Sequence, residues 1–299
     1  MNQSPTVIII AGPTAVGKTA LSVQLAEQLG GEIISADSRQ CYRELSIGVA
    51  RPSPEELQRV KHHFIASHSL HDQINAISFE QVALAIADQL FQKSNFVVMT
   101  GGTGLYIKAF MEGLDPIPPV SAEMRERIQK EYEEKGLIWL QTQIQELDPE
   151  FWKQAEQQNP RRLQRALEVV TSTGQSILHY RKSAQVERPF RILPFCLTHP
   201  TDVLRKRIDQ RIDAMLAAGW LEEVKTLIPF RHLPALQTVG YQELFDYLDG
   251  THSMEEAIQK IRINTWHYAR RQMTWWRRQP GFIQLSANQS PIETILRHC

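Results

Sequence analysis

An apolar run, a glycine-bounded turn and a helical segment follow one another at the start of the chain. Thr6–Ala11 (TVIIIA) is apolar and β-branched, which is typical of a strand buried on both faces of a sheet. The next residues, GPTAVGKT, match the phosphate-binding pattern GxxxxGK followed by Ser or Thr, and Ala20–Leu29 continues with helical periodicity. Backbone N–H groups, a helix N-terminus and a lysine would then converge on a phosphate. The residues predicted to bind a diphosphate or nucleotide are Gly12, Pro13, Thr14, Ala15, Val16, Gly17, Lys18 and Thr19.

Strands and helices alternate along the rest of the chain. Glu32–Ala36, Phe96–Met99 and Arg191–Leu197 have the composition of strands, and Phe79–Phe91 has that of an amphipathic helix. This alternation predicts an α/β fold, with a P-loop NTPase-like parallel sheet and right-handed crossovers. Further helices are predicted at Asp202–Leu216, Leu221–Leu227, Tyr241–Leu248 and Met254–Arg278, which gives a helical C-terminal region.

The parallel core is predicted to contain an insertion. Three prolines in Asp115–Pro119 interrupt regular structure, and the chain from Ser121 to about Tyr180 has helical composition without a strand pattern. We therefore predict a P-loop catalytic core formed by residues 1–116 and 191–299, and an inserted all-helical domain at residues 117–190.

The composition is that of an ordinary globular protein and does not indicate a particular partner. Lys and Arg together number 33, as do Asp and Glu, so the net charge indicates no polyanionic ligand. The three cysteines form no CxxC pair, which is typical of reduced thiols. No stretch approaches the roughly 18 apolar residues of a membrane span. We expect a cytoplasmic monomer with no membrane partner.

A second group of polar residues follows two predicted strands. Asp37–Gln40 (DSRQ) comes after one strand and Gly101–Tyr106 (GGTGLY) after another. Carboxyl ends of parallel strands meet at one edge, where open α/β sheets bind ligands. Arg207 and Arg211 lie one turn apart on a later helix; spacing alone favours a solvated face with ion pairs to the aspartates at 209 and 213.

Seven segments together resemble the tRNA dimethylallyltransferases, also called isopentenyltransferases. They are GPTAVGKT, SADSRQCYR, GGTGLY, NPRRLQRALEV, RIDQRIDAMLAAGWLEEV, VGYQEL and YARRQMTWWRR, and the likeness extends from about Thr6 to Arg278. The chain departs from the family pattern at Cys41, where a larger apolar residue is expected, and at Arg271, where lysine is frequent. Neither position has a proposed catalytic role.

The resemblance implies the activity and its partners. A dimethylallyl group would pass from dimethylallyl diphosphate to N6 of the adenosine at position 37, next to the tRNA anticodon. The resemblance makes Asp37 the general base, Thr103 a contact of the reacting nucleotide and Arg211 a phosphate contact. It places tRNA binding at Asp37, Ser38, Arg39, Gln40, Thr103, Arg125, Arg161, Arg162, Leu163, Gln164 and Arg165.

The chemistry gives physical reasons for these residue types. A carboxylate can take a proton from the weakly nucleophilic N6 as the C–N bond forms, although Asp37 would serve equally well as a turn former. Lys18 and Mg²⁺, with Thr19 as its predicted ligand, would stabilise charge on the departing diphosphate. Asp37 is the only acid at the end of a neighbouring strand, and from the residues alone it could be a partner of the metal or a catalytic base. The Gln40 amide could pair with an adenine edge or be a plain surface amide.

The C-terminal region has the composition of a nucleic-acid face. Residues 257–292 contain no Asp or Glu, yet hold six Lys or Arg residues interleaved with Trp and Tyr. Basic side chains neutralise phosphates and aromatic rings stack on bases, although some of the tryptophans are expected in the core. The histidines at 62, 63, 68 and 71 are expected on a loop, and their spacing does not fit a zinc site. We expect them to be structural or to line the substrate site weakly.

Three other functions share part of this pattern. A small-molecule or nucleoside kinase would use the P-loop, but would gain nothing from the carboxylate-free basic tail. A non-catalytic RNA-binding NTPase switch would need a second acid at a strand end, which FVVM does not supply. An enzyme that prenylates free adenine nucleotides would not need the large basic insertion.

Overall fold

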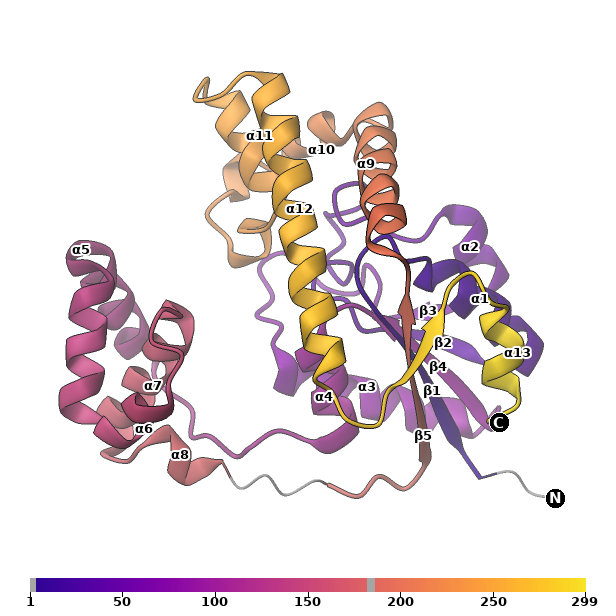
Figure 1. The fold of residues 1–299 in the computed structure, drawn as a ribbon, viewed down its shortest axis with the longest axis horizontal. Helices are drawn as coiled ribbons and strands as arrows, with labels where there is room; N and C mark the ends of the chain where they lie inside the picture. Colours follow the sequence, from indigo (N-terminus) through magenta and orange to yellow (C-terminus); the bar gives the residue numbers. More distant parts are fainter. Residues whose placement is uncertain (1–3, 182–185) are drawn as a thin grey trace. The chain divides into compact units, whose positions relative to one another are not determined.

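The core is built on a six-stranded sheet in which every observed pairing is parallel. A computed structural model describes residues 4–181 and 186–299, and Figure 1 shows its fold. The strands have the order β3-β2-β4-β1-β5-β6. Their bounds are β1 Thr6–Ala11, β2 Glu32–Ser35, β3 His62–His63, β4 Phe96–Gly101, β5 Arg191–Thr198 and β6 Ile283–Ser286. The predicted α/β class is confirmed.

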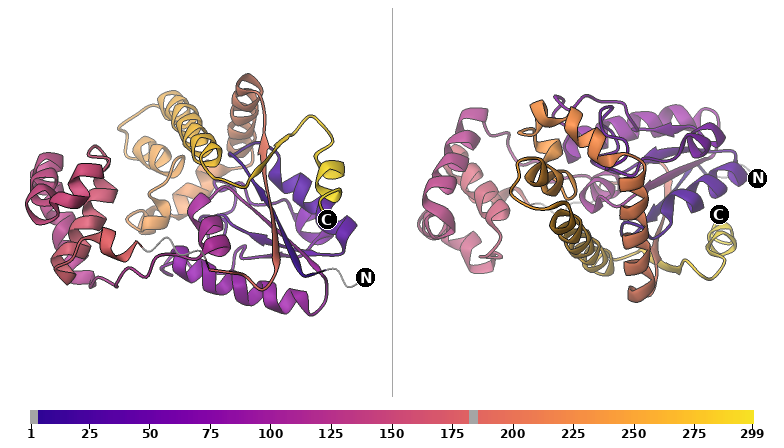
Figure 2. Two further views of the ribbon diagram at one scale, coloured as in Figure 1. Left: turned by 60° about the horizontal axis from the view of Figure 1, so that its bottom comes forward. Right: turned by 90° about the horizontal axis from the view of Figure 1, so that it is seen from above.

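The central strand β1 is apolar along its whole length because it is buried on both faces. Ile8 pairs with Val98 of β4 and with Leu193 of β5, and every residue of β1 is buried. Helix α1 (Lys18–Leu29) covers one face, and α3 (Ala76–Phe91) with α4 (Gly104–Glu112) covers the other (Figure 2). These helices cover both faces of the sheet at its central strands.

A group of helices lies beyond the carboxyl ends of the strands. Helix α9 follows β5 and packs against α12, while α11 packs against α10 and α12. Figure 1 shows the group standing over the edge at which β1 and β5 end. The bounds are α9 Thr201–Ala217, α10 Trp220–Thr226, α11 Tyr241–Leu248 and α12 Met254–Arg277. The smaller elements of the core are α2 Pro54–Arg59, α13 Pro291–Leu296 and the short 3-10 helices Ile228–Phe230 and Pro234–Leu236.

The described residues form two compact units. The core unit consists of residues up to Glu112 and from Glu187 onward, and the insertion unit is Gly113–Val186. Each boundary lies a few residues from the one expected from the sequence. Arg188 fixes the place where the chain rejoins the core: it donates to Phe110 O at 2.8 Å and pairs with Glu80 at 2.6 Å.

The insertion unit has its own apolar core. Its helices are α5 Ala122–Leu147, α6 Pro149–Gln154, α7 Pro160–Thr173 and α8 Ile177–Tyr180. Leu140, Ile144 and Leu163 are fully buried within it. Gly136 kinks α5 with a φ of 74°, so the predicted helical stretch consists of shorter helices joined by turns. Residues 113–121, which include the three prolines, contain no helix or strand.

Two strands differ from the sequence-based expectation. His62 and His63 were expected on a loop, but they form the short edge strand β3 because they pair with Ile33 and Ile34. β6 was not predicted, and it is held by parallel pairing with β5. In residues 4–181 and 186–299, no helix combines the length and apolarity needed to cross a bilayer.

Candidate active site

The P-loop follows β1 closely and places two glycines where other residues would be strained or would clash. Gly12 has a φ of 144°, and a Cβ there would lie 2.6 Å from Leu197 O of the neighbouring strand. Gly17 has a φ of 102° and precedes the first residue of α1. The loop can therefore pass close to β5 and deliver the N-terminus of a long helix, which attracts anions.

Lys18 lies on the inner side of the loop, close to other charges. Its Nζ donates to Gly12 O at 3.1 Å and to Pro13 O at 2.7 Å, which leaves one of its three protons for a phosphate oxygen. Burial, followed by repulsion from Arg211, lowers the pKa of Lys18 to about 8, while nearby Asp37 acts in the opposite direction. The charge of this lysine is therefore sensitive to pH in the physiological range.

Two arginines of α9 reach the P-loop. Arg207 Nε donates to Ala15 O at 2.7 Å, and Arg211 Nη1 lies 3.4 Å from Thr14 Oγ1. The alternative of a solvated face is wrong for this pair, because Asp209 and Asp213 instead pair with Arg262 of α12. Asp37 lies near enough to raise the pKa of Arg211, although burial has the larger, opposite effect.

These groups line an open hollow on the outer side of the P-loop. The hollow is lined by Ala15, Gly17, Lys18, Thr19, Ala20, Ala50, Arg51, Pro52, Glu56, Arg207, Gln210 and Arg211. Four basic residues, the Thr19 hydroxyl and backbone N–H groups at the start of α1 thus line the same space. Such a set suits a polyanion.

Asp37 lies at the carboxyl end of β2, with its carboxylate fixed by its own turn. Its Oδ1 accepts from Arg39 N at 2.9 Å and from Gln40 N at 3.3 Å. The turn-forming role considered from the sequence is therefore real. It occupies only Oδ1: within the described chain Oδ2 accepts no hydrogen bond and is left for a ligand.

The other predicted residues of this edge are held by the protein itself. Thr103 Oγ1 accepts from Ser38 N at 3.1 Å, so it ties the β4 loop to the β2 loop, and it does not line the cavity described below. Gln40 Nε2 donates to Val49 O at 3.2 Å and to Ala50 O at 3.0 Å. This amide is engaged inside the protein, in place of the surface position that we had considered.

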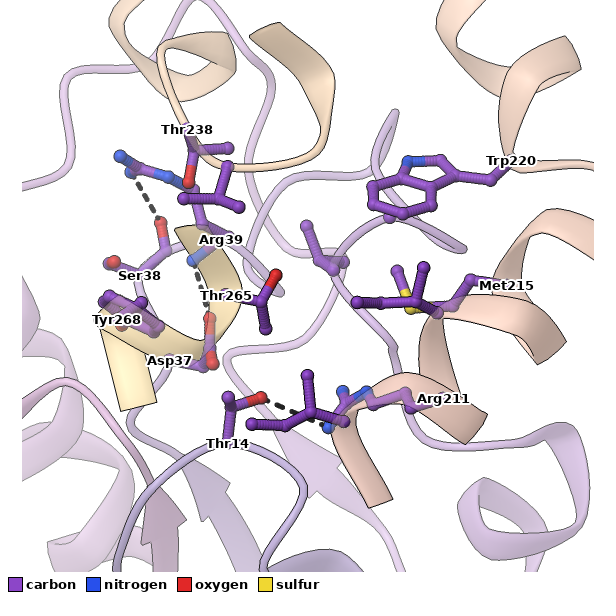
Figure 3. Close-up of a pocket in the computed structure, with 15 residues that line it drawn as sticks. Thr14, Asp37, Ser38, Arg39, Arg211, Met215, Trp220, Thr238, Thr265 and Tyr268 are labelled. Atoms are coloured by element: carbon purple, nitrogen blue, oxygen red, sulfur yellow. Dashed lines mark hydrogen bonds between the residues drawn. The ribbon is translucent and has the colours of Figure 1, made fainter. Parts of the chain in front are cut away.

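A cavity joins Asp37 to the P-loop (Figure 3). Its volume is about 140 Å³, and an apolar cavity of about 150 Å³ is known to bind benzene. One part of the lining is apolar: Val49, Ile208, Ile212, Met215, Trp220 and Val239. The polar part is Thr14, Asp37, Ser38, Arg39, Arg211, Thr238, Thr265 and Tyr268, and Gly48 completes the wall. Arg211 lines both this cavity and the P-loop hollow.

Three residues that position this site had no predicted role. Gln272 of α12 bridges the P-loop and the Gly102 loop, and Glu223 of α10 accepts from Ser46 N, Ile47 N and Gly48 N at 2.7–3.0 Å. Trp220 forms part of the cavity wall. All three lie in segments that carry the family resemblance, but only the fold shows what they contact.

The insertion residues predicted to bind tRNA lie in the other unit. Arg125 and Arg161 are exposed, whereas Arg162 pairs with Glu156 at 3.0 Å and Arg165 with Glu168 at 3.1 Å. Gln164 donates to Gln129 Oε1 at 2.9 Å. The Leu163 side chain is fully buried in the core of this unit, so it packs the helix and is not a side chain that RNA could contact.

Among the residues that the structure describes, no group of three or more His, Cys, Asp or Glu side chains could hold a metal ion. His63 Nε2 lies 2.5 Å from Glu32 Oε2, and His62 Nδ1 lies 2.8 Å from Val60 O. For His62 and His63, these contacts agree with a structural role.

Comparison with known proteins identifies the family. Residues 40–279 match the family model described as IPP transferase. The chain belongs to the IPP transferase family. It is 45% identical over 274 residues to tRNA dimethylallyltransferase 1 of Bacteroides thetaiotaomicron, and the match covers 92% of this chain and 89% of that one.

Solved structures of IPP transferases have the same fold. The full-length tRNA isopentenylpyrophosphate transferase of Bacillus halodurans superposes with a TM-score of 0.73 at 32% identity, covering 98% of this chain and 95% of that one. A eukaryotic dimethylallyltransferase acting on tRNA gives a TM-score of 0.79 at 23% identity, covering 99% and 78%, which supports the fold.

Proposed function

We propose that this protein transfers a dimethylallyl group from dimethylallyl diphosphate to N6 of the adenosine at position 37, next to the tRNA anticodon. The cavity carries this proposal, because it joins a phosphate-binding loop, a free carboxylate oxygen and an apolar wall. A kinase needs the first of these features but not an apolar chamber between the phosphate site and the base. The names of the relatives within the family support the same activity.

The diphosphate of the donor is assigned to the P-loop hollow. Lys18, Arg207 and Arg211 face it, together with the N–H groups at the start of α1. As the allylic C–O bond breaks, negative charge grows on the departing diphosphate, and these preorganised donors stabilise that charge. Arg211 lines both the hollow and the cavity, so we assign it to the bond that breaks between them.

The free Oδ2 of Asp37 is assigned the role of general base. The N6 lone pair forms the bond to C1 of the allyl group, the C1–O bond breaks, and an N6 proton passes to Asp37. Because Oδ1 is fixed by two backbone N–H groups, the carboxylate presents Oδ2 in one orientation. Tyr268 lines the same part of the cavity, and burial raises its pKa to about 12, so its phenol stays a neutral donor there.

Mg²⁺ is proposed as the cofactor. The Thr19 hydroxyl on the first turn of α1 is a hard oxygen ligand beside the hollow, and Mg²⁺ commonly completes its shell with substrate phosphates and water. The donor set therefore fits this ion. When bound, it would neutralise charge on the diphosphate.

The tRNA is proposed to contact both units. Arg125 and Arg161 are exposed on the insertion unit, and the basic residues of α12 lie beside the cavity-lining Thr265 and Tyr268 of the same helix. The exposed arginines can neutralise phosphates of the stem-loop. We place the reaction in the cytoplasm and assign it to a monomer, since one chain supplies the whole cavity and its described cysteines are free thiols.

A direct assay tests the reaction. The protein is incubated with dimethylallyl diphosphate, Mg²⁺ and unmodified tRNA, and the tRNA is digested to nucleosides and analysed by mass spectrometry. We expect one dimethylallyladenosine per tRNA, and none from a transcript in which position 37 is guanosine. Prenylation at another adenosine would overturn the assigned position, and the absence of any product would overturn the proposed activity.

A further inference from the structure

We infer that Trp220 closes the far end of the cavity and thereby limits the donor to a five-carbon prenyl group. The inference rests on the proposed function and concerns its specificity. The cavity is polar where it meets the P-loop, at Thr14 and Arg211, and apolar where Met215 and Trp220 line it. In Figure 3 Trp220 lies across the cavity from Thr14 and Arg211. A prenyl diphosphate bound at the P-loop therefore directs its tail toward the indole.

The indole is seated in space that two glycines provide. A Cβ on Gly48 would lie 2.2 Å from Trp220 Nε1, and a Cβ on Gly240 would lie 2.1 Å from Trp220 Cζ2. Tyr241 packs edge-on against the same ring, with centroids 6.1 Å apart and an angle of 82° between the planes. Trp220 is only 2% exposed, so its ring is held on several sides.

The surroundings of Trp220 are also fixed by hydrogen bonds. Glu223, one turn along α10, accepts from Gly48 N at 3.0 Å and from Tyr241 Oη at 2.7 Å. Ser46 and Ile47 donate their N–H groups to the same carboxylate. The loop and the tyrosine that contact the indole are thus tied to the helix that carries it. Because these contacts hold Trp220 in place, its side chain does not move aside for a longer ligand.

The size of the cavity agrees with a short donor. Its volume of about 140 Å³ resembles that of a cavity able to hold six-carbon benzene, whereas a geranyl group has ten carbons. Interiors packed to crystal density do not accommodate added carbons without displacement of side chains. Geranyl transfer would make and break the same bonds as dimethylallyl transfer, so only the room for the tail differs.

The test compares two donors in the full-length protein with unmodified tRNA and Mg²⁺. For wild type we expect kcat/KM for geranyl diphosphate to be at least about 100-fold below that for dimethylallyl diphosphate, since a few carbons decide that much in an apolar pocket. Trp220→Ala should raise the ratio of geranyl to dimethylallyl kcat/KM by about 100-fold. Trp220→Leu should raise it less.

Controls separate this inference from a general loosening of the fold. Phe91→Ala removes a ring that packs on Phe190, and Phe91 does not line the cavity; its ratio should stay at the wild-type value. Circular dichroism and thermal unfolding establish which variants are folded. A folded Trp220 variant that transfers dimethylallyl groups but keeps the wild-type ratio overturns the inference.

If both Trp220 variants fail to fold, the inference is tested with the wild-type protein alone. Geranyl diphosphate should then compete for the donor site more weakly than dimethylallyl diphosphate, with inorganic diphosphate as the tail-free reference. Equal competition and equal transfer by the two donors overturn the inference and leave the proposed function intact. Absence of dimethylallyl transfer by wild type overturns the proposed function instead.

Discussion

Gln272 of α12 holds the P-loop through Thr14: its Oε1 accepts from Thr14 N at 2.8 Å. Its Nε2 donates to Gly102 O at 3.0 Å, and a Cβ on Gly102 would lie 2.4 Å from that nitrogen. One buried amide therefore fixes the distance between the diphosphate loop and the loop after β4. A residue of α12 thereby holds in place a loop that lies 258 residues earlier in the sequence.

Gln272→Ala should lower both stability and turnover. The buried carbonyl of Gly102 and the half-buried N–H of Thr14 lose their partner, which costs about 1–3 kcal/mol of unfolding free energy. A shift of about 1 Å in the P-loop can cost roughly 100-fold in rate, so we expect single-turnover transfer to fall by about 10- to 100-fold. Urea unfolding and single-turnover assays measure the two effects.

Gln279→Ala is the matched control, because the Gln279 side chain follows the end of α12 and, among the described residues, donates only to Trp275 O of that helix. It should be nearly neutral in both assays. Turnover is measured well below the melting temperature of Gln272→Ala. If it equals that of wild type, the Gln272 bridge contributes to stability and not to the rate of transfer.

Asp37→Asn should remove the base and preserve the turn. Asparagine keeps an Oδ1 that accepts from Arg39 N and Gln40 N, so the loop should stay in place. Loss of a general base typically lowers the rate by at least about 100-fold. We expect that loss in single-turnover transfer, with affinity for dimethylallyl diphosphate nearly unchanged when it is measured well below pH 8, where Lys18 stays protonated.

Asp72→Asn serves as the control for Asp37→Asn, since within residues 4–181 and 186–299 the Asp72 carboxylate accepts only from Ser69 N, on an exposed loop. Rapid-quench transfer and equilibrium donor binding are measured for both variants. Near-normal transfer by folded Asp37→Asn would remove this residue from the role of base.

Donor affinity should fall as pH rises through about 8. The pKa of Lys18 is lowered to about 8, so the free protein loses this positive charge above that pH. Phosphate groups complete their second ionisation near pH 6, so the ligand is not the group that titrates. The pKa of Lys18 in the unfolded chain is higher, so its contribution to folding stability increases from about pH 8 to 10.5.

Calorimetric titration of dimethylallyl diphosphate at several pH values measures this effect. Lys18→Ala should bind weakly and show little dependence on pH in the same range. An equally steep fall in that variant would assign the titration to another group.

Thr19→Ala should weaken donor binding through the metal. With the hydroxyl removed, Mg²⁺ keeps only phosphate and water ligands, so more Mg²⁺ is needed for the same occupancy. We expect the half-saturating Mg²⁺ concentration for transfer to rise by about tenfold, with turnover at saturating Mg²⁺ partly restored. A Thr19→Ala defect independent of Mg²⁺ would contradict the assignment.

The sequence predicted the elements that depend on local pattern. Thr6–Ala11 and Tyr241–Leu248 have the predicted bounds, because a buried run and an amphipathic helix show their periodicity directly. His62–His63 has no such pattern, since a two-residue edge strand is defined by its partner β2. β6 is likewise defined by pairing with β5.

The same distinction applies to the site. Asp37 directly follows a strand and Lys18 belongs to the P-loop motif. The local sequence was therefore enough to predict both residues at the carboxyl edge of the sheet. Glu223 anchors a loop 175 to 177 residues away, and Gln272 contacts a loop 258 residues away. Contacts of this kind have no periodicity, because they arise only when the sheet brings distant segments together.

Arg161 offers the sharpest test of the insertion as a tRNA-binding unit. It is exposed at the start of α7 and makes no ion pair within the described part of the chain, whereas Arg165 pairs with Glu168. If Arg161 contacts a tRNA phosphate, Arg161→Ala should flatten the slope of log affinity against log salt by about 0.7–0.9. Thermal stability should be unchanged, since the side chain supports no neighbour.

Three variants measured by filter binding at several salt concentrations separate the roles. Lys153→Ala, on the helix before α7, removes a charge of the same sign and reports the general effect of net charge on the slope. Glu168→Gln releases Arg165 from its ion pair; it should strengthen tRNA binding if Arg165 lies near phosphates and leave it unchanged otherwise. Donor binding belongs to the core unit and should be the same in all of them. A salt slope for Arg161→Ala equal to that of wild type would show that this end of α7 does not contact tRNA phosphates.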